Sequence, residues 1–220
     1  MKKALKVPMR EMPRIRILNL FRRSRLRYED LDHLVLGLNN PGRRYAATRH
    51  NIGARVLARL VERESLSFHP GRGAFKGTRL KGTFGEALLA LPTTFMNRSG
   101  IAGRELLGLT GLDTVQALAV FDDLDLPLGR IRFRASGGSG GHRGLESLIY
   151  EWGREDFPRL RVGIGRPESG DIPDFVLAPF KEEDLDRVGR IVDAAADSVR
   201  FYLESGLERA ANRFNSLIIE

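Results

Sequence analysis

Four polar residues of this 220-residue chain stand where catalytic groups are often found, next to apolar segments that predict buried strands. His50 lies in "RHNIG", just before an amphipathic segment, and Asp122 ends the apolar run "LAVFD". Asn40 opens "NPG" in the loop that leads to His50, and Asn97 lies in "TTFMNRSG". An imidazole can take a proton from water, a carboxylate can hold its tautomer, and amides can bind a developing oxyanion. These residue types predict a site that activates water, although periodicity alone does not show that they converge.

The elements that must position these residues follow from the hydrophobic pattern. Apolar or alternating runs predict strands at 33–38, 85–92, 115–123, 129–136 and 158–165. Apolar residues at helical spacing predict helices over 52–64, 145–152 and about 181–204. Strands interleaved with helices indicate an α/β fold, a single domain with helices on both faces of the sheet. The loops at the ends of such a sheet are the usual place for a functional site.

The net charge of +8 belongs to the start of the chain. Residues 1–28 hold ten Lys or Arg against one acid, a sum of +9, whereas residues 29–220 hold 26 basic against 27 acidic residues, a sum of −1. We therefore expect a basic N-terminal extension, residues 1–31, that is disordered or loosely packed, followed by a domain over residues 32–220. An RNA-contacting arm and an organelle-targeting peptide are the alternatives for the extension.

Several classes of site are excluded or unsupported by the sequence. The chain has no cysteine, which excludes disulfides and thiolate chemistry. No apolar run reaches the ~20 residues that span a bilayer, and no secretion signal is evident. The four histidines are far apart in the sequence and form no HExxH pair, and no glycine-rich nucleotide motif occurs, so we expect neither a metal nor a cofactor.

A serine nucleophile is the alternative that "GGSGG" raises, because Ser139 matches the pattern GxSxG between a predicted strand and a helix. That kind of hydrolase places its acid and its histidine after the serine. The histidine that follows here, His142, is three residues away and cannot serve as a distant base. A backbone-approach loop rich in glycine is the favoured interpretation.

Five blocks of the chain, in order, resemble the signature blocks of bacterial-type peptidyl-tRNA hydrolases. They are "LVLGLNNPGRRYAATRHNIG", "LPTTFMNRSG", "FDDLDLPLGRIRF", "GGSGGHRGLESLI" and "FPRLRVGIGRP", and the resemblance covers about residues 33 to 215. It implies a single α/β domain with a twisted mixed sheet, no metal and no cofactor. It also implies an enzyme that cleaves the ester between a peptide and the terminal ribose of tRNA, acting as a monomer in the cytoplasm; an organelle is the alternative if the extension is a transit peptide.

The resemblance also implies roles for particular residues. His50 is expected to be the general base and Asp122 to orient it, while Asn40 and Asn97 position the peptide and the attacked carbonyl. Further expected contacts with the substrate or its tRNA come from Tyr45, His142, Arg143, Arg132 and Arg161. Arg132 and Arg161 also lie on predicted strand faces that carry several arginines, for which a solvated face is the plain alternative.

Three departures from the family pattern bear on this prediction. Phe121 stands before the catalytic aspartate, where the family usually has histidine, and Asp123 follows it where glutamate is common. Arg143 stands where the family has asparagine, which puts that asparagine's role in doubt; a cation there could instead bind the phosphate near the CCA end. Asn39 replaces a glycine, a mild change because asparagine tolerates left-handed backbone. A non-catalytic RNA-binding relative of the same fold is therefore the rival function.

Overall fold

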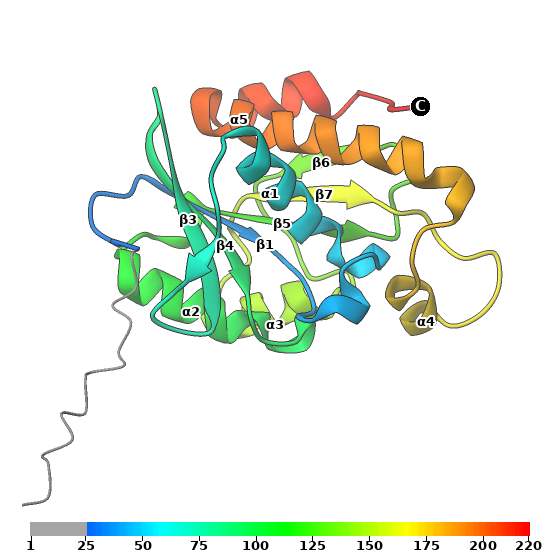
Figure 1. Ribbon diagram of the computed structural model, residues 1–220, viewed down its shortest axis with the longest axis horizontal. Helices are drawn as coiled ribbons and strands as arrows, with labels where there is room; N and C mark the ends of the chain where they lie inside the picture. Colours follow the sequence, from blue (N-terminus) through cyan, green and yellow to red (C-terminus); the bar gives the residue numbers. More distant parts are fainter. Residues whose placement is uncertain (1–25) are drawn as a thin grey trace, which may run out of the picture.

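A seven-stranded mixed sheet forms the centre of the computed structural model, which describes residues 26–220 (Figure 1). Its strand order is β2-β3-β4-β1-β5-β7-β6. Strands β4, β1, β5 and β7 are parallel, while β3 and β6 pair antiparallel with β4 and β7. The strands are β1 (His33–Gly37), β2 (His69–Pro70), β3 (Phe75–Gly82), β4 (Gly85–Pro92), β5 (Ala117–Asp123), β6 (Ile131–Arg134) and β7 (Arg159–Gly163).

Helices cover both faces of this sheet, as predicted. In Figure 1, α1 (Ile52–Arg63) and α5 (Leu185–Phe214) lie above the sheet, and α2 (Ser99–Thr110) and α3 (Arg143–Trp152) lie below it. The short helix α4 (Ile172–Leu177) lies beyond one end of the strands. No helix within residues 26–220 is both long enough and apolar enough to cross a membrane.

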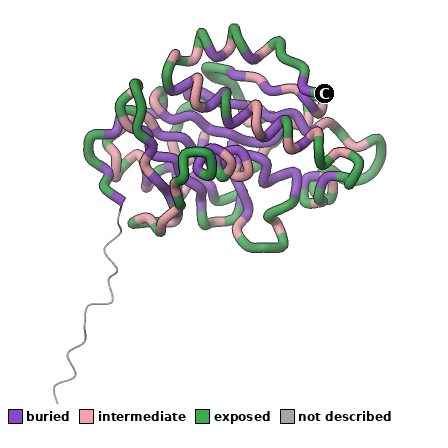
Figure 2. The backbone as a smooth tube through the Cα atoms, turned by 45° about the horizontal axis from the view of Figure 1, so that its top comes forward, coloured by how far each residue is buried: buried purple, intermediate pink, exposed green. Residues whose placement is uncertain are grey.

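Two apolar cores lie between the sheet and its helices, one on each face of the sheet. Figure 2 shows that buried backbone occupies the middle of the molecule. Strand β1 contributes to both: Val35 packs toward α1 and α5, whereas Leu34 and Leu36 pack toward α2 and α3. Alternate residues of a strand point to opposite faces, so a strand covered on both sides is apolar throughout. This explains why the central strands were predicted well from short apolar runs.

Two glycines bring α1 against the sheet at the point where the site lies. A Cβ added to Gly53 would lie 2.2 Å from the carbonyl oxygen of Val120 in β5. A Cβ added to Gly37, at the end of β1, would lie 2.7 Å from the carbonyl oxygen of Gly53. Only glycine permits this approach of helix and strand backbones. The segment "RHNIG" therefore ends in glycine because the helix that follows His50 touches β5.

Some elements differ from the sequence prediction. Strand β3, next to the short edge strand β2, was not predicted, because Lys76, Arg79 and Lys81 interrupt its apolar residues. Helix α5 begins later and runs about ten residues further than predicted, and it contains a break at Gly206, where φ is 80°. Residues 26–31, assigned by sequence to the extension, contribute buried side chains: Leu26, Tyr28 and Leu31 belong to the core between the sheet and helices α2 and α3. Residues 1–25 lie outside the described part of the chain.

Candidate active site

His50 and Asp122 form a buried hydrogen-bonded pair at the carboxyl end of β5. Both carboxylate oxygens lie 2.9 Å from Nδ1 of His50. His50 belongs to a single 3-10 turn, Arg49–Asn51, that leads directly into α1, and Asp122 is the penultimate residue of β5. The close approach of α1 to β5 at Gly53 carries the imidazole to the carboxylate. The predicted pairing across 72 residues of sequence is therefore present in the fold.

The hydrogen bond to Asp122 fixes the tautomer of His50. An ionised carboxylate only accepts hydrogen bonds, so Nδ1 must carry the proton. In the neutral ring Nε2 then has a free lone pair, which is the state required of a general base. His50 also lines a cavity of about 700 Å³, a volume typical of a ligand site. The pair can therefore take a proton from a molecule held in that cavity.

His142 is a second partner of Asp122 that sequence reasoning did not place here. Its Nε2 lies 3.0 Å from Oδ1 of the carboxylate, and its Nδ1 accepts a hydrogen bond from the backbone amide of Leu145. That amide belongs to the first turn of α3, so His142 is the N-cap of the helix. The capping bond assigns the proton to Nε2, which donates to Asp122. Two of the four histidines, distant in sequence, thus have ring centroids 4.8 Å apart.

Two opposing effects act on the pKa of Asp122. Complete burial raises it, because removal from water disfavours the carboxylate, but the charges and hydrogen bonds of His142 and His50 lower it. The two imidazoles prevail and hold the pKa of this carboxyl well below its ordinary range. Phe121, 3% exposed, packs its ring edge to face against His142 at 4.9 Å and helps exclude water from that imidazole.

Hydrogen bonds hold both the backbone and the side chain of Asn40. The side chain of Asn51 accepts a hydrogen bond from the Asn40 backbone amide at 2.7 Å and donates one to its carbonyl at 2.8 Å. The Asn40 side-chain oxygen accepts from the backbone amide of Met96 at 2.9 Å. The Nδ2 hydrogens of Asn40 are the donors that remain for a ligand in the cavity that it lines. Asn51, directly after His50, was missed as a positioning residue, although "RHN" offered the signal.

The cavity brings most of the predicted site residues together. Its walls include Asn40, Asn97, His142 and Arg143, and Tyr45 meets Phe95 edge to face, with ring centroids 6.2 Å apart. Asn97 is exposed and follows β4, across β1 from Asp122 in the order of the sheet. Helix α4 contributes apolar side chains to a further wall, among them Ile172 and Val176. That helix was not predicted from the sequence.

Arginines gather on the opposite side of Asp122, on β7 and β6. Arg132 pairs in register with Arg161, and Arg134 with Arg159, so these four share one sheet face. Arg161 forms an ion pair with Asp123, and Arg159 is buried, donating to the carbonyls of the glycine loop at Gly137 and Gly138. Arg161 and Arg134 line the cavity, whereas Arg132 is half-buried and lies outside its lining. Arg134 was not singled out from the sequence.

The geometry disfavours a serine nucleophile. Ser139 lines the cavity, but its hydroxyl accepts a hydrogen bond from the amide of Gly141 at 3.3 Å. Both ring nitrogens of His142 are used by Leu145 and Asp122, so this imidazole has no free nitrogen for the serine. His50, Asp122 and His142 place ligand atoms within 4.8 Å of one another, a spacing that a metal ion could use. Their hydrogen bonds to one another already explain the arrangement.

Comparisons with known proteins agree with this fold. The chain matches the family model for peptidyl-tRNA hydrolase over residues 34–219. A peptidyl-tRNA hydrolase of Methylacidiphilum infernorum is 45% identical over 186 residues, covering 84% of this chain and 98% of that protein. One from Syntrophomonas wolfei is 41% identical over 182 residues, covering 83% and 99%. The crystal structure of peptidyl-tRNA hydrolase from Acinetobacter baumannii aligns with a TM-score of 0.79 at 29% identity, covering 86% of this chain and 97% of that one. The chain therefore belongs to the peptidyl-tRNA hydrolase family.

Proposed function

We propose that this protein hydrolyses the ester bond of peptidyl-tRNA, and of N-blocked aminoacyl-tRNA, and so releases the peptide and free tRNA. The observation that carries the proposal is the His50–Asp122 pair at 2.9 Å, which leaves Nε2 of the imidazole free at the cavity. An ester has an adequate leaving group, so one base with oxyanion donors suffices without a covalent nucleophile. Family membership supports the same reaction and favours it over a purely RNA-binding role.

In this mechanism His50 takes a proton from water as the oxygen attacks the ester carbonyl. When the tetrahedral intermediate collapses, the bond to the ribose oxygen breaks and the imidazolium gives its proton to that oxygen. Asp122 stabilises the imidazolium that forms, and the lowered pKa of its carboxyl keeps it charged throughout the reaction. The side-chain amides of Asn40 and Asn97 bind the carbonyl oxygen as it becomes an oxyanion. Both line the cavity, and Asn40 has its other amide atom engaged by Met96, which fixes its orientation. His142 holds Asp122 from the other side.

The tRNA is assigned to the side of the cavity that carries Arg161 and Arg134. A phosphate bound there would contact Arg161, which also pairs with Asp123. Arg132 lies opposite Arg161 in the sheet register and extends the cationic face away from the cavity. Tyr45 also lines the cavity and offers an aromatic face to the terminal nucleotide of the tRNA, which carries the ester. Affinity built on phosphate contacts falls steeply with salt. Action as a monomer in the cytoplasm, and one catalytic domain preceded by a basic extension, stay predictions.

Release of tRNA from an N-acetyl-aminoacyl-tRNA tests this function. His50→Ala removes the base, and a positioned general base typically contributes ~10²–10⁴ in rate. Asp122→Asn should also lose activity strongly, because the wrong tautomer of an analogous triad histidine costs ~10⁴. Both variants should still bind tRNA, with affinity that weakens as salt rises. A wild-type protein that binds tRNA without cleaving it, or a His50→Ala variant that retains full turnover, would instead support the RNA-binding relative.

A further inference from the structure

A second hollow of about 440 Å³ adjoins the catalytic cavity and shares two residues with it, Asn97 and Arg143. It lies against the beginning of α2 and along α3, from Arg143 to Glu151. The backbones of the two helices are in close contact, because a Cβ added to Gly100 would lie 2.0 Å from the carbonyl oxygen of Ser147. We call this hollow the α2–α3 groove. Because the two hollows adjoin at these residues, a long ligand bound in the cavity can reach past them into the groove.

The order of the strands says which half of the substrate reaches this groove. Asp122 ends β5, Arg161 and Arg134 lie on β7 and β6 to one side, and Asn97 follows β4 on the other side. The ester lies at His50, so the two halves of the substrate must leave it in different directions. If the polyanionic tRNA takes the arginine side, as in the proposed function, then the peptide takes the side of Asn97. The α2–α3 groove continues that side.

The charges of the groove are not balanced. Arg98 and Arg143 are exposed, and neither guanidinium has an ion-pair partner among residues 26–220. Of the two carboxylates in the groove, Glu151 is neutralised by Arg104 at 2.6 Å, which leaves only Glu146 to oppose the two arginines. Arg143 begins α3 and Arg98 immediately precedes α2, positions where the helix dipole disfavours a cation. Neither arginine stabilises its helix, so a role in binding better explains both.

We propose that the α2–α3 groove binds the part of the peptide beyond the residue esterified to tRNA, and that Arg98 and Arg143 favour acidic side chains there. The proposal rests on the proposed function and specifies its peptide selectivity. Tyr150, 84% exposed at the same groove, offers an uncovered ring for packing against the peptide.

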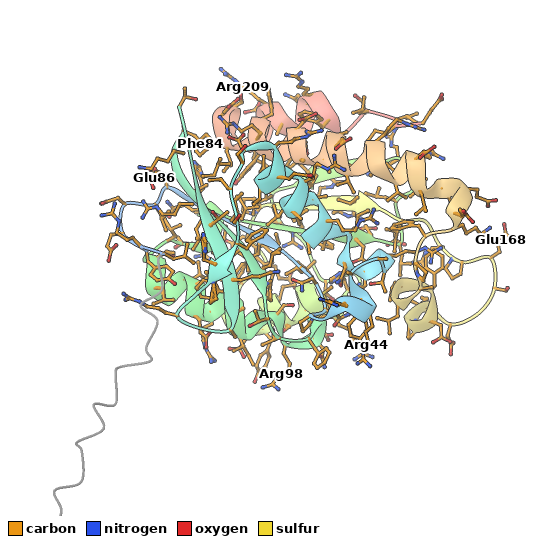
Figure 3. All side chains as sticks on the ribbon, viewed as in Figure 1. Arg44, Phe84, Glu86, Arg98, Glu168 and Arg209 are labelled. Carbon is orange, nitrogen blue, oxygen red and sulfur yellow. The ribbon has the colours of Figure 1, made fainter. Side chains whose placement is uncertain are left out.

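The test uses N-acetylated peptidyl-tRNAs that differ only by Glu, Gln or Lys at one position, together with a single-residue N-acetyl-aminoacyl-tRNA. At the position that faces the groove, the Glu substrate should exceed the Lys substrate in kcat/KM by about two- to fivefold, the range of an exposed ion pair. Arg98→Glu should reverse that ratio, and Arg143→Asn should reduce it. Arg209→Glu is the matched control, because Arg209 is exposed on the far side of the molecule from Arg98 (Figure 3), and it should leave the ratio unchanged.

Three results would overturn the proposal. One is a ratio near one at every peptide position in the wild-type protein. Another is a ratio that Arg209→Glu changes as much as Arg98→Glu does. The third is an Arg98→Glu variant that slows every substrate equally, the single-residue one included, and has a shallower salt dependence, which would assign the groove to RNA. The same ratios measured as Kd with His50→Ala need no turnover, so failure of the catalytic proposal is distinguishable from failure of this one.

Discussion

At the scale of single residues, the site depends on a side chain that takes no part in the chemistry. Asn51 is 4% exposed and satisfies both backbone groups of Asn40. In the wild-type protein, Nδ2 of Asn51 donates to the Asn40 carbonyl oxygen at 2.8 Å. Asn51→Asp keeps the oxygen that accepts from the Asn40 amide but replaces this donor with a carboxylate oxygen, which repels the carbonyl. We expect the free energy of unfolding to fall by about 1–3 kcal/mol, the cost of an unsatisfied buried group. Turnover should fall by up to ~10², because small misplacements of catalytic groups are costly.

Thermal unfolding and kcat on an N-acetyl-aminoacyl-tRNA check this prediction. Asn212→Asp makes the same chemical change at an exposed position of α5 and serves as the control. If Asn51→Asp loses stability but keeps full kcat, then Asn51 supports the fold without positioning Asn40. If Asn51→Asp changes neither the stability nor kcat, then the two hydrogen bonds of Asn51 to Asn40 contribute to neither property in solution.

The residue scale is also where sequence prediction was strongest and where its limit is visible. His50, Asp122, Asn40 and Asn97 were predicted from polar residue types beside apolar runs and from the family resemblance, and all four line one cavity, while their roles stay predictions. The contact of His142 with Asp122 was not found, because it depends on the direction in which the glycine loop turns before α3. Three glycines of that loop, Gly137, Gly140 and Gly141, have positive φ, and no local pattern specifies the path that such a loop takes.

At the scale of elements, the contact between α1 and β5 decides whether base and carboxylate meet. Gly53→Ala places a methyl group 2.2 Å from the Val120 carbonyl oxygen, so the helix must move away from the strand that carries Asp122. We expect a loss of about 1–3 kcal/mol from overpacking, which exceeds the usual gain of alanine over glycine in a helix. Activity should fall as well, because His50 moves with the start of α1.

Gly108→Ala is the matched control for this change. Gly108 also lies within a helix, α2, but a Cβ there meets no atom within 4 Å, so alanine should stabilise the protein by about 0.5–1 kcal/mol. Chemical denaturation and tRNA release are measured for both variants. Equal changes in the free energy of unfolding for the two variants would show that α1 and β5 can separate to accept a methyl group at little cost. The close approach of the two elements would then not explain the glycine at the end of "RHNIG".

The wall formed by α4 is tied to the catalytic turn by one buried arginine. Arg49 donates to the carbonyls of Phe175 and Ala178 at 3.1 and 3.3 Å, and its guanidinium lies 4.2 Å from the centre of the Phe175 ring. Burial lowers the pKa of Arg49, and Asp184 opposes that effect. Arg49→Lys keeps the charge but loses the planar guanidinium, which stacks on the Phe175 ring while its Nη1 donates to both carbonyls.

We expect Arg49→Lys to raise KM more than it lowers kcat, because α4 lines the cavity without carrying a catalytic group. Steady-state kinetics on peptidyl-tRNA measure the two constants separately. Arg55→Lys is the comparison, because the Arg55 guanidinium lies 5.7 Å from the centre of the Phe180 ring but makes no hydrogen bond to α4 among the described residues. A fall in kcat alone for Arg49→Lys would indicate that Arg49 acts on His50 and not on the wall.

At the scale of the whole molecule, the fold was predictable where elements are covered on both sides and less so at the periphery. Strands β1, β4 and β5 carry apolar residues throughout, so their short runs specified them. Strand β3 lies nearer the edge, where Lys76 and Lys81 face solvent, and α4 is only six residues long. The packing of Leu26 and Tyr28 was not predicted, because the arginines around them gave the segment a high net charge. Net charge does not show whether the apolar residues of a segment contact the core.

The stability of the whole molecule toward acid should depend on Asp122. Its pKa is lower in the folded protein than in the unfolded chain, so the folded state resists protonation. Its contribution is therefore present above the unfolded value, ~3.9, and is lost as the pH falls below it toward the folded pKa. Wild-type protein and Asp122→Asn should differ in free energy of unfolding by an amount that declines below about pH 4, by at most ~1.4 kcal/mol per pH unit for one proton.

Urea unfolding at a series of pH values measures that difference directly. Asp156→Asn is the control, because Asp156 is exposed and its pKa is lowered mainly by a hydrogen bond from Arg154, which water screens. The Asp156 difference should depend on pH less steeply than the Asp122 difference. Parallel curves for wild type and Asp122→Asn would mean that the two imidazoles do not hold the carboxylate charged in the folded state. The orienting role of Asp122 toward His50 would then lose its electrostatic basis, because a protonated carboxyl cannot stabilise an imidazolium by its charge.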